Sequence, residues 1–441
     1  MVTPEATLVV GGGVAGLLCA RELTRAGHPV LLLERESEVG GRVRTSVRDG
    51  FRLDHGFQVL FTAYPTLAAA LDLPALDLRA FRPAAVLAGG ARHPAVIGDA
   101  LANLALFWPT LIAPQLSLLD KVRMLQLRLL ATSLPFDECF APRFDAVSTR
   151  SFLQRRGFTD NAICNFFAPF YGGILLDRSL ETSAAVLLYT FKMLAEGRTV
   201  VPAQGMGAIT AQLAAALPGG SIRTGVTVTR VVVEQGVLQG VLLDDGALVR
   251  AASVVLACDP PAIATLAASA GVHVEMPTGS LGCSTVYLRS PAPLLDGDAL
   301  WLNTARDATV SHAITISNVA PSYAPAGQTL TAATVLGAAA TLDDTELVRR
   351  VRSDLAAMSG QSGDRTRGQT NAESAGVVAV WRVPYSQYAQ PPGSSAHRVP
   401  SETALRGLVL ASEAGHTSSL EGAARGGISA ARVLLHHTET P

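Results

Sequence analysis

The first 34 residues alternate between apolar runs and a helical stretch. Residues 7–10 form a short apolar run, residues 14–26 place apolar positions at helical spacing, and residues 30–33 form a second apolar run. Glycines 11–13 occupy the turn between the first run and the helical stretch. The pattern predicts a strand, a helix and a strand with a glycine-rich turn after the first strand.

The rest of the chain changes period several times. Residues 64–198 are mostly helical in pattern, apart from a hairpin expected at 86–92. Further helices are expected at 208–217, 344–358 and 422–435, and strands at 227–234, 237–244, 253–257 and 407–411. Between residues 281 and 383 most segments have strand character. The fold class is therefore α/β, with pieces of the first sheet at both ends and in the middle of the chain.

This distribution predicts two interleaved domains. Residues 1–75, 199–262 and 400–441 are expected to form a nucleotide-binding domain with a parallel sheet. Residues 76–198 and 263–399 are expected to form a substrate domain with an antiparallel sheet and a helical cap.

Composition narrows the function classes. The 441 residues carry 35 basic and 36 acidic side chains, so no basic surface for a nucleic acid is expected. The five cysteines are widely spaced without a CxxC pair, which excludes a disulfide framework and a zinc site of the usual spacing. No metal is expected. The N-terminus lacks a basic region before its apolar run, so no signal peptide is expected and the predicted location is the cytoplasm.

Residues 100–119 form an uncharged run of membrane-spanning length. Pro109 and Pro114 interrupt it, which argues against a transmembrane helix. Two interpretations remain open: a buried helix of the cap, and a segment that makes peripheral contact with a membrane surface.

The glycine turn carries a dinucleotide-binding pattern, Gly11-x-Gly13-x-x-Gly16, between a predicted strand and a predicted helix. Gly11 permits the tight turn, Gly13 lets the backbone approach a pyrophosphate, and Gly16 lets helix and strand pack closely. The backbone amides of Val14 and Ala15 open the helix, where its dipole attracts an anion. The pattern predicts a pyrophosphate site.

An acidic residue stands where such a site needs one. Glu34 ends the second strand, 18 residues after the last glycine of the pattern, where its carboxylate can accept ribose hydroxyls. A carboxylate there disfavours a 2′-phosphate, although the adjacent Arg35 weakens that argument.

The segment that follows, residues 34–45 (ERESEVGGRVRT), resembles the second motif of the flavin amine oxidoreductase superfamily. This superfamily includes monoamine oxidases, protoporphyrinogen oxidases and carotenoid (phytoene) desaturases. The resemblance implies a Rossmann-type FAD-binding domain of the glutathione reductase kind (GR2-like). It also implies that Gly40 and Gly41 pass close to the flavin and that Arg42 contacts the pyrophosphate. A rigid guanidinium suits a phosphate, and glycine leaves room for a ring.

Two further segments resemble the family. In residues 51–58 (FRLDHGFQ) the resemblance places Gly56, Phe57 and Gln58 beside the isoalloxazine. Residues 225–234 resemble the strand whose backbone holds the adenine, which assigns that role to Val228.

The C-terminal segment, residues 410–431, resembles the family's closing motif. The resemblance implies that Glu413 meets the ribityl chain and that a helix start at Leu420 to Ala423 faces the flavin pyrimidine. A helix dipole there would stabilise the anionic reduced flavin. Ser412 replaces the glycine common in the family, and the cysteine of covalent flavin enzymes is absent. FAD is therefore expected to bind non-covalently.

The substrate region gives weaker signals. Residues 281–288 resemble the strand on which amine oxidases of the family place a lysine near the flavin, but this chain has no lysine there. Residues 202–207 (PAQGMG) and Trp381-x-x-Pro384 resemble segments of carotenoid desaturases. Residues 166–175 (FFAPFYGGIL) resemble a cap segment that could line an apolar tunnel or simply pack in the core. We expect hydride transfer from an apolar small molecule to flavin N5. Alternatives are an amine oxidase, a protoporphyrinogen oxidase, and a non-catalytic binding protein like the Rab GDP-dissociation inhibitors, which share this scaffold.

The catalytic candidates are few. His55 lies next to the predicted flavin segment, and Trp381 and Tyr385 are candidates to face the flavin, while His416 follows Glu413 closely. A histidine in such a place is more often structural than catalytic. No second dinucleotide pattern follows a strand, so oxygen or a quinone is the expected electron acceptor.

Overall fold

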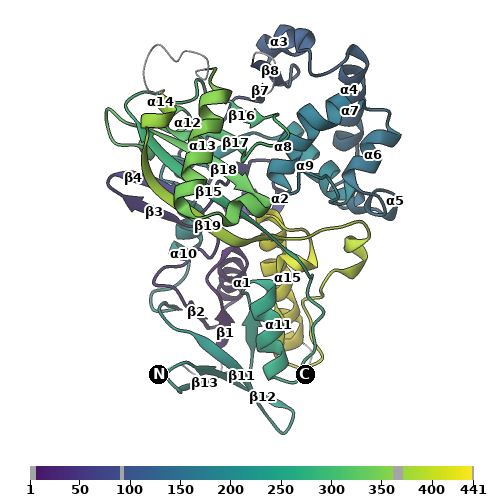
Figure 1. Ribbon diagram of the computed structural model, residues 1–441. Coiled ribbons are helices and arrows are strands. Elements are labelled where there is room, and N and C mark those ends of the chain that lie inside the picture. Colours follow the sequence, from purple (N-terminus) through teal and green to yellow (C-terminus); the bar gives the residue numbers. More distant parts are fainter. Residues whose placement is uncertain (1–5, 90–93, 361–370, 440–441) are drawn as a thin grey trace.

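The computed structural model describes residues 6–89, 94–360 and 371–439, and a five-stranded parallel sheet lies at one end of it (Figure 1). In spatial order its strands are β10 (Ile222–Arg223), β2 (Val30–Leu33), β1 (Thr7–Val10), β14 (Val254–Leu256) and β20 (Leu408–Leu410). All four neighbouring pairs are parallel, so the carboxyl ends of the strands meet at one edge. In sheets of this kind that edge binds the ligand.

Alternating strand residues face two different cores. One face packs on α1 (Val14–Arg25), α10 (Gly207–Ala215) and α15 (Leu420–Glu439). The other packs on α11 (Pro260–Ser269) and on a small antiparallel sheet, β11 (Val228–Glu234), β12 (Val237–Leu243) and β13 (Leu248–Arg250). Helices α1 and α15 approach so closely that a Cβ at Gly427 would overlap the carbonyl oxygen of Ala15.

The second large sheet of the molecule has seven strands. In spatial order its strands are β19 (Gly376–Tyr388), β15 (Ser280–Ser290), β18 (Thr329–Leu336), β17 (Val310–Thr315), β16 (Leu300–Asn303), β7 (Ala84–Ala88) and β8 (Ala95–Gly98). All pairs are antiparallel except β16 with β7, which is parallel. Helix α13 (Asp344–Met358) covers one face and α8 (Ala168–Ile174) lies on the other.

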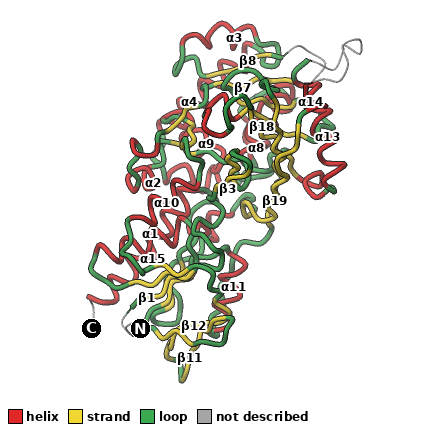
Figure 2. Tube along the Cα trace, turned by 90° about the vertical axis from the view of Figure 1, so that its left-hand side faces the viewer, coloured by secondary structure: helices red, strands yellow, loops and turns green. Residues whose placement is uncertain are grey.

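The helices of the cap lie beside this sheet (Figure 1). They are α4 (Leu118–Ser133), α5 (Pro142–Asp145), α6 (Thr149–Arg155), α7 (Asp160–Ala162), a π-helical turn (Ile163–Phe167), α8 and α9 (Ala184–Glu196). Shorter elements are β3 (Thr45–Arg48), β4 (Phe51–Asp54), β5 (Leu60–Phe61), α2 (Pro65–Ala70), β6 (Leu78–Ala80), α3 (Phe107–Ile112), β9 (Thr199–Pro202), α12 (Ile316–Val319) and α14 (Asn371–Ser374). Figure 2 shows α3 at the opposite end of the elongated molecule from β11 and β12.

Most elements match the sequence prediction. The opening strand, helix and strand are present, and α13 has the expected bounds. The expected hairpin is β7 and β8, although its turn, residues 90–93, lies outside the described residues. Strands β10 and β13 were not expected, because each has only two or three residues. The exact domain boundaries expected from the sequence stay a prediction.

The buried cap helix expected at residues 100–119 is wrong. The segment consists of a 3₁₀ turn (Leu104–Leu106), the short helix α3 and the start of α4. Leu104 is 81% exposed, Trp108 is 68% exposed and Ile112 is 74% exposed. Within the described residues, no helix combines the length and the hydropathy that a membrane crossing requires.

Candidate active site

In the turn between β1 and α1, backbone atoms pack closely around two of the three glycines of the pattern, and the third borders open space. Gly11 has a φ of +112°, and a Cβ there would lie 2.6 Å from the carbonyl oxygen of Ala257. A Cβ at Gly16 would overlap the carbonyl oxygen of Gly11. A Cβ at Gly13 would meet nothing within 4 Å. The first two glycines are therefore required by the fold, whereas Gly13 borders open space.

The amino end of α1 faces this space. Val14 and Ala15 form its first turn, and no side chain caps it. Backbone amides without a protein partner at a helix start form a ready site for an anion. The geometry is what a pyrophosphate requires.

Glu34 lies beside the same turn and is 7% exposed. Its carboxylate accepts hydrogen bonds from the amide of Gly12 at 2.7 Å and from that of Glu36 at 2.9 Å. The start of β11, which carries Val228, is near because the amide of Val226 donates to the carbonyl of Glu34 at 2.9 Å. Arg35 points to solvent: its side chain is 73% exposed and pairs with Glu36.

The Gly40–Gly41 turn packs directly on the first turn. The amide of Gly40 donates to the carbonyl of Gly12 at 2.7 Å, and a Cβ at Gly41 would lie 3.3 Å from the Cα of Gly13. Both glycines have positive φ angles, +130° and +57°. The structure therefore joins the two motifs that the sequence placed about 30 residues apart.

Arg42 reaches the end of β20. Its Nη1 donates to Oε1 of Glu413 at 2.9 Å and to the carbonyl of Ser386 at 2.8 Å. Burial alone would lower the pKa of Arg42, but the Glu413 carboxylate offsets this and raises it, so the guanidinium stays charged. Arg42 therefore pairs with Glu413, and its contact with the pyrophosphate stays a prediction.

The segment 56–58 lies against the seven-stranded sheet. The amide of Phe57 donates to Oγ1 of Thr285 at 3.2 Å, and the side-chain amide of Gln58 donates to the carbonyl of Arg42 at 2.7 Å. A Cβ at Gly56, whose φ is +94°, would lie 3.3 Å from Val383. This segment therefore connects the turn at Arg42 with the seven-stranded sheet.

Two of the catalytic candidates are brought together. The rings of His55 and Trp381 lie 3.8 Å apart between centroids, with 32° between their planes. Burial, followed by the charge of Arg44, lowers the pKa of His55 to about 4, so the imidazole is neutral near pH 7. Its Nε2 lies 2.8 Å from the hydroxyl of Ser46. The ring of Tyr385 lies 6.0 Å from the Arg42 guanidinium.

The start of α15 lies beside Glu413. The amide of Ala423 donates to the carbonyl of Ser419 at 2.9 Å, and the hydroxyl of Ser418 donates to Glu413 at 3.4 Å. Leu420 is the first residue of the helix. The helix amino end, Arg42 and the Gly56 segment are thus linked through Glu413 and Gln58.

Several polar atoms at this place are buried without a partner. They are Nε of Arg44, Oε1 of Gln58 and the hydroxyl of Tyr385. Unpaired buried polar atoms are rare in folded proteins and indicate a missing ligand or water. Together with the open space at Gly13 and the uncapped α1, they fit a bound FAD, whose phosphates and flavin edge are polar.

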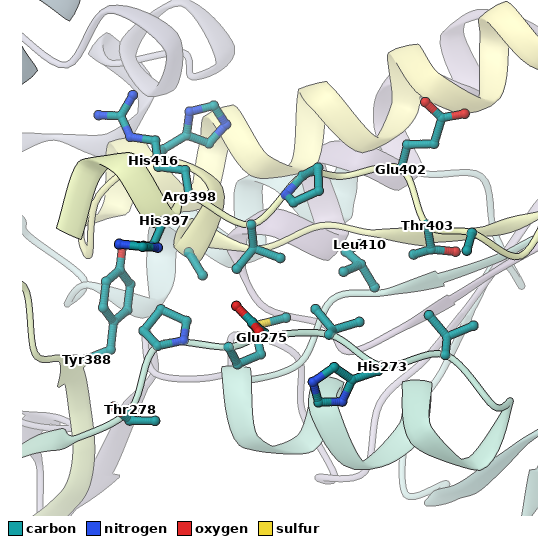
Figure 3. Close-up of a pocket in the computed structure, with 18 of the residues that line it drawn as sticks. His273, Glu275, Thr278, Tyr388, His397, Arg398, Glu402, Thr403, Leu410 and His416 are labelled. Carbon is teal, nitrogen blue, oxygen red and sulfur yellow. The ribbon is translucent and has the colours of Figure 1, made fainter. Parts of the chain in front are cut away.

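His416 does not join this group. Its Nε2 lies 3.5 Å from the hydroxyl of Ser429, and the residue lines a separate cavity of about 850 Å³ between the loop after α11 and residues 388–405 (Figure 3). Sequence reasoning missed Ser386 and Thr285, which position Arg42 and Phe57. No local signal marks them, because each contacts a segment more than 200 residues away.

Strand β15, which contacts the segment 56–58, has no lysine, as the sequence indicated. On β15 the side facing the cap carries Cys283, Thr285 and Tyr287. The chain's two lysines lie elsewhere: Lys121 donates to the backbone carbonyls of Leu111 and Ala113 at the end of α3, and Lys192 pairs with Glu196.

The comparisons with known proteins agree with this geometry. Among solved structures, a putative protoporphyrinogen oxidase from Exiguobacterium sp. 255-15 matches with a TM-score of 0.74 at 19% identity, covering 99% of this chain and 100% of that chain. A putrescine oxidase in complex with putrescine matches with a TM-score of 0.71 at 18% identity, covering 98% and 99% of the two chains. At these identities the likeness shows the fold.

Curated relatives match over shorter stretches. A coproporphyrinogen III oxidase from Propionibacterium freudenreichii is 27% identical over 172 residues, 38% of this chain and 31% of that protein. The small chain of an NADPH glutamate synthase from Mycobacterium tuberculosis is 39% identical over 98 residues, and the match spans only 20% of its length. The model of the family described as flavin containing amine oxidoreductase, by contrast, matches residues 14–435. The chain therefore belongs to the flavin containing amine oxidoreductase family.

Proposed function

We propose that the protein is an oxidoreductase with non-covalently bound FAD that oxidises an apolar small molecule by hydride transfer to the flavin. The amides at Gly13, Val14 and Ala15 hold the pyrophosphate, and Glu34 accepts the ribose hydroxyls. The adenine lies against the backbone at Val228. FAD supplies a two-electron acceptor at N5, and oxygen or a quinone reoxidises it.

The second half of the site holds the flavin end. Gly40, Gly41 and Gly56 leave room for the ring, and Phe57 and Gln58 border it. Arg42 and Glu413 contact the pyrophosphate and ribityl chain, and the α15 start at Leu420 to Ala423 stabilises the reduced flavin edge with its dipole. These assignments rest on the contacts described above.

The observation that carries the substrate class is that no charged side chain lies between Cys283 and Tyr287 on the cap-facing side of β15, where Arg289 follows only at the exposed end of the strand. Cys283, Thr285 and Tyr287 occupy that side, and Tyr287 is 2% exposed with its hydroxyl bound to the carbonyl of Asp54 at 2.8 Å. In the cap, the rings of Phe166 and Phe170 stack at 5.7 Å. A site with such walls binds an apolar substrate in preference to a polyamine.

The residues beside the flavin offer little acid–base chemistry. His55 is neutral and its ring is held against Trp381, so both act as a wall that orients the substrate. Desaturation removes a hydride and then a proton, and a delocalised cation such as that of a polyene is acidic enough to lose its proton to water, so it needs no protein base. This favours desaturation of the kind carried out by carotenoid desaturases.

An amine or a porphyrinogen is the second candidate. Two structural neighbours, a putative protoporphyrinogen oxidase and a putrescine oxidase, share the fold with this chain. The missing lysine on β15 counts against the amine. A non-catalytic binding protein on the same scaffold is the third reading, and the unpaired polar atoms of the flavin site count against it.

An absorbance spectrum of the purified protein, before and after denaturation, tests the proposal. We expect flavin bands near 450 nm that are released on denaturation, since FAD is held without a covalent bond. The FAD-loaded protein is then mixed anaerobically with a polyene, a diamine and a porphyrinogen, and bleaching is recorded. A colourless protein that FAD cannot reconstitute contradicts the proposal, and bleaching by the diamine alone favours the second candidate.

We also propose that the protein contacts a membrane surface peripherally. Ten large apolar residues between positions 101 and 129 are exposed: Leu101, Leu104, Phe107, Trp108, Ile112, Leu118, Leu119, Val122, Leu125 and Leu129. An apolar patch of this size on one end of a molecule indicates an interaction surface. Arg123 lies in the same stretch of chain, with its guanidinium against Gly157, next to the exposed Arg155 and Arg156, and arginines suit anionic head groups. An apolar substrate could be taken up from the bilayer there.

A further inference from the structure

Two adjacent strands of the seven-stranded sheet bury polar groups that have no partner. His312 of β17 is 4% exposed, and its Nδ1 is buried without a hydrogen-bond partner in the described part of the chain. Thr334 of β18 is 2% exposed, and its hydroxyl is also unpaired. The two residues stand directly opposite one another in the sheet. Since opposite residues point to the same face, the unpaired groups form one cluster.

The cluster lies in line with the flavin site. Trp381 pairs with Thr285, Thr285 pairs with Thr334, and Thr334 pairs with His312, so one row of side chains crosses four strands. Phe57 bridges the row, because its amide binds Thr285 and its ring lies 5.2 Å from the ring of His312. One end of the row therefore contacts His55, and the other ends in the unpaired imidazole.

The end of the row at His312 is covered by α8 and by flanking segments with uncommon backbone conformations. A Cβ at Gly173 of α8 would lie 2.7 Å from Nδ1 of His312, so only glycine lets the helix approach. The preceding turn, Ile163–Phe167, is π-helical, and Leu176 after the helix has a φ of +54°. Both features cost free energy and are frequent at functional sites. Because Gly173 blocks Nδ1, Nε2 is the nitrogen that remains for a ligand.

We propose that His312 and Thr334 bind a neutral hydrogen-bonding group, a hydroxyl or a carbonyl, at the end of an otherwise apolar substrate. The inference rests on the proposed function and makes its substrate class more specific. A buried hydroxyl without a partner, such as that of Thr334, is costly unless a ligand satisfies it, and Nε2 of His312 is the nitrogen beside it that the same ligand can reach. A cationic end is disfavoured, because the guanidinium of Arg178, which donates to the carbonyl of Asn303 at 3.0 Å, acts on the same imidazole.

The charge state agrees with this assignment. Burial, and then the charge of Arg178, lowers the pKa of His312 to about 4. At neutral pH the imidazole therefore offers one donor and one acceptor, and the Thr334 hydroxyl offers both.

The test uses FAD-loaded protein and three probes of one shape: butylbenzene, 4-phenyl-1-butanol and 4-phenylbutylammonium. Their dissociation constants are read from the change in flavin absorption. We expect the alcohol to bind about fivefold more tightly than the hydrocarbon or the ammonium, the gain from one net hydrogen bond. In His312→Leu and in Thr334→Val the alcohol falls to the affinity of butylbenzene, while butylbenzene itself changes less than about twofold.

The control is Thr331→Val, on the opposite face of β18, where the hydroxyl binds that of Thr315 at 3.0 Å. It should lower the unfolding midpoint and keep the alcohol preference, whereas His312→Leu should keep the midpoint because it removes an unpaired polar group. An FAD-loaded wild type without the preference, or a preference that survives in both site variants, overturns the inference alone. A protein that takes up no FAD overturns the proposed function as well.

Discussion

Arg42 and Glu413, which are 371 positions apart in the chain, form an ion pair of 2.9 Å. The side chain of Glu413 is 6% exposed and that of Arg42 is 33% exposed. The pair joins the Gly40–Gly41 turn to the short 3₁₀ turn that begins at Glu413, three residues after the end of β20, across the carboxyl edge of the parallel sheet. The pair therefore fixes the two ends of the proposed flavin site to one another.

Removing the arginine should weaken both folding and cofactor binding. In Arg42→Gln the Glu413 carboxylate stays buried without its partner, so the free energy of unfolding should fall by about 2 kcal/mol, and FAD should bind more weakly. Urea unfolding and flavin titration measure the two effects. Arg350→Gln on α13, whose partner Glu346 is on the surface, is the control and should leave the unfolding midpoint nearly unchanged, because solvent screens an exposed ion pair. Equal behaviour of the two variants would contradict the assignment.

Glu34→Gln should lower the affinity for FAD about tenfold, since a hydrogen bond to a charged group is lost and the carboxamide turns a donor towards one backbone amide. Flavin fluorescence on titration of the FAD-free protein measures this. Glu38→Gln, four residues away and exposed, removes the same charge and should bind FAD normally. Unchanged affinity in Glu34→Gln would place the ribose elsewhere.

Stability should fall as the pH is lowered from 7 to 5. The pKa of His312 is about 4 in the folded protein against 6.5 in the unfolded chain, so the unfolded state binds more protons in this window. In His312→Leu the loss of unfolding free energy between pH 7 and pH 5 should be smaller by about 1–2 kcal/mol. Urea unfolding at both pH values gives the difference. An identical pH dependence in the variant and the wild type would show that this imidazole titrates normally.

The apolar end of the molecule should bind vesicles. The wild type should float with liposomes of phosphatidylcholine and phosphatidylglycerol, and Trp108→Glu should reduce the floating fraction by more than about half, because it places a charge in the apolar patch. Val237→Glu, at a position 60% exposed on β12 at the other end, is the matched control and should float normally (Figure 2). If the wild type stays at the bottom of the gradient, the membrane proposal fails.

The elements that could be predicted from the sequence are those whose structure depends on residues close to one another in the chain. The strand, glycine turn and helix at residues 7–25, and α13, follow from apolar spacing. The Arg42–Glu413 pair and the row from Trp381 to His312 could not be predicted, because they depend on how distant strands align. The buried helix expected at residues 100–119 was wrong for a related reason. Apolar composition shows that a segment avoids water, but it does not show whether protein or another partner covers it.

In the proposed function the Gly11–Gly16 turn holds the FAD pyrophosphate, and the affinity of Gly13→Ala for FAD is the sharpest test of that role. Gly13 has an ordinary φ of −78°, and a Cβ there would meet no atom within 4 Å, so the FAD-free variant should unfold at the wild-type midpoint. Gly16→Ala, by contrast, should destabilise the fold because its Cβ overlaps the Gly11 carbonyl. We expect FAD to bind Gly13→Ala at least about tenfold more weakly, since the methyl group occupies the place of the pyrophosphate. Wild-type affinity for FAD in this variant would contradict the account.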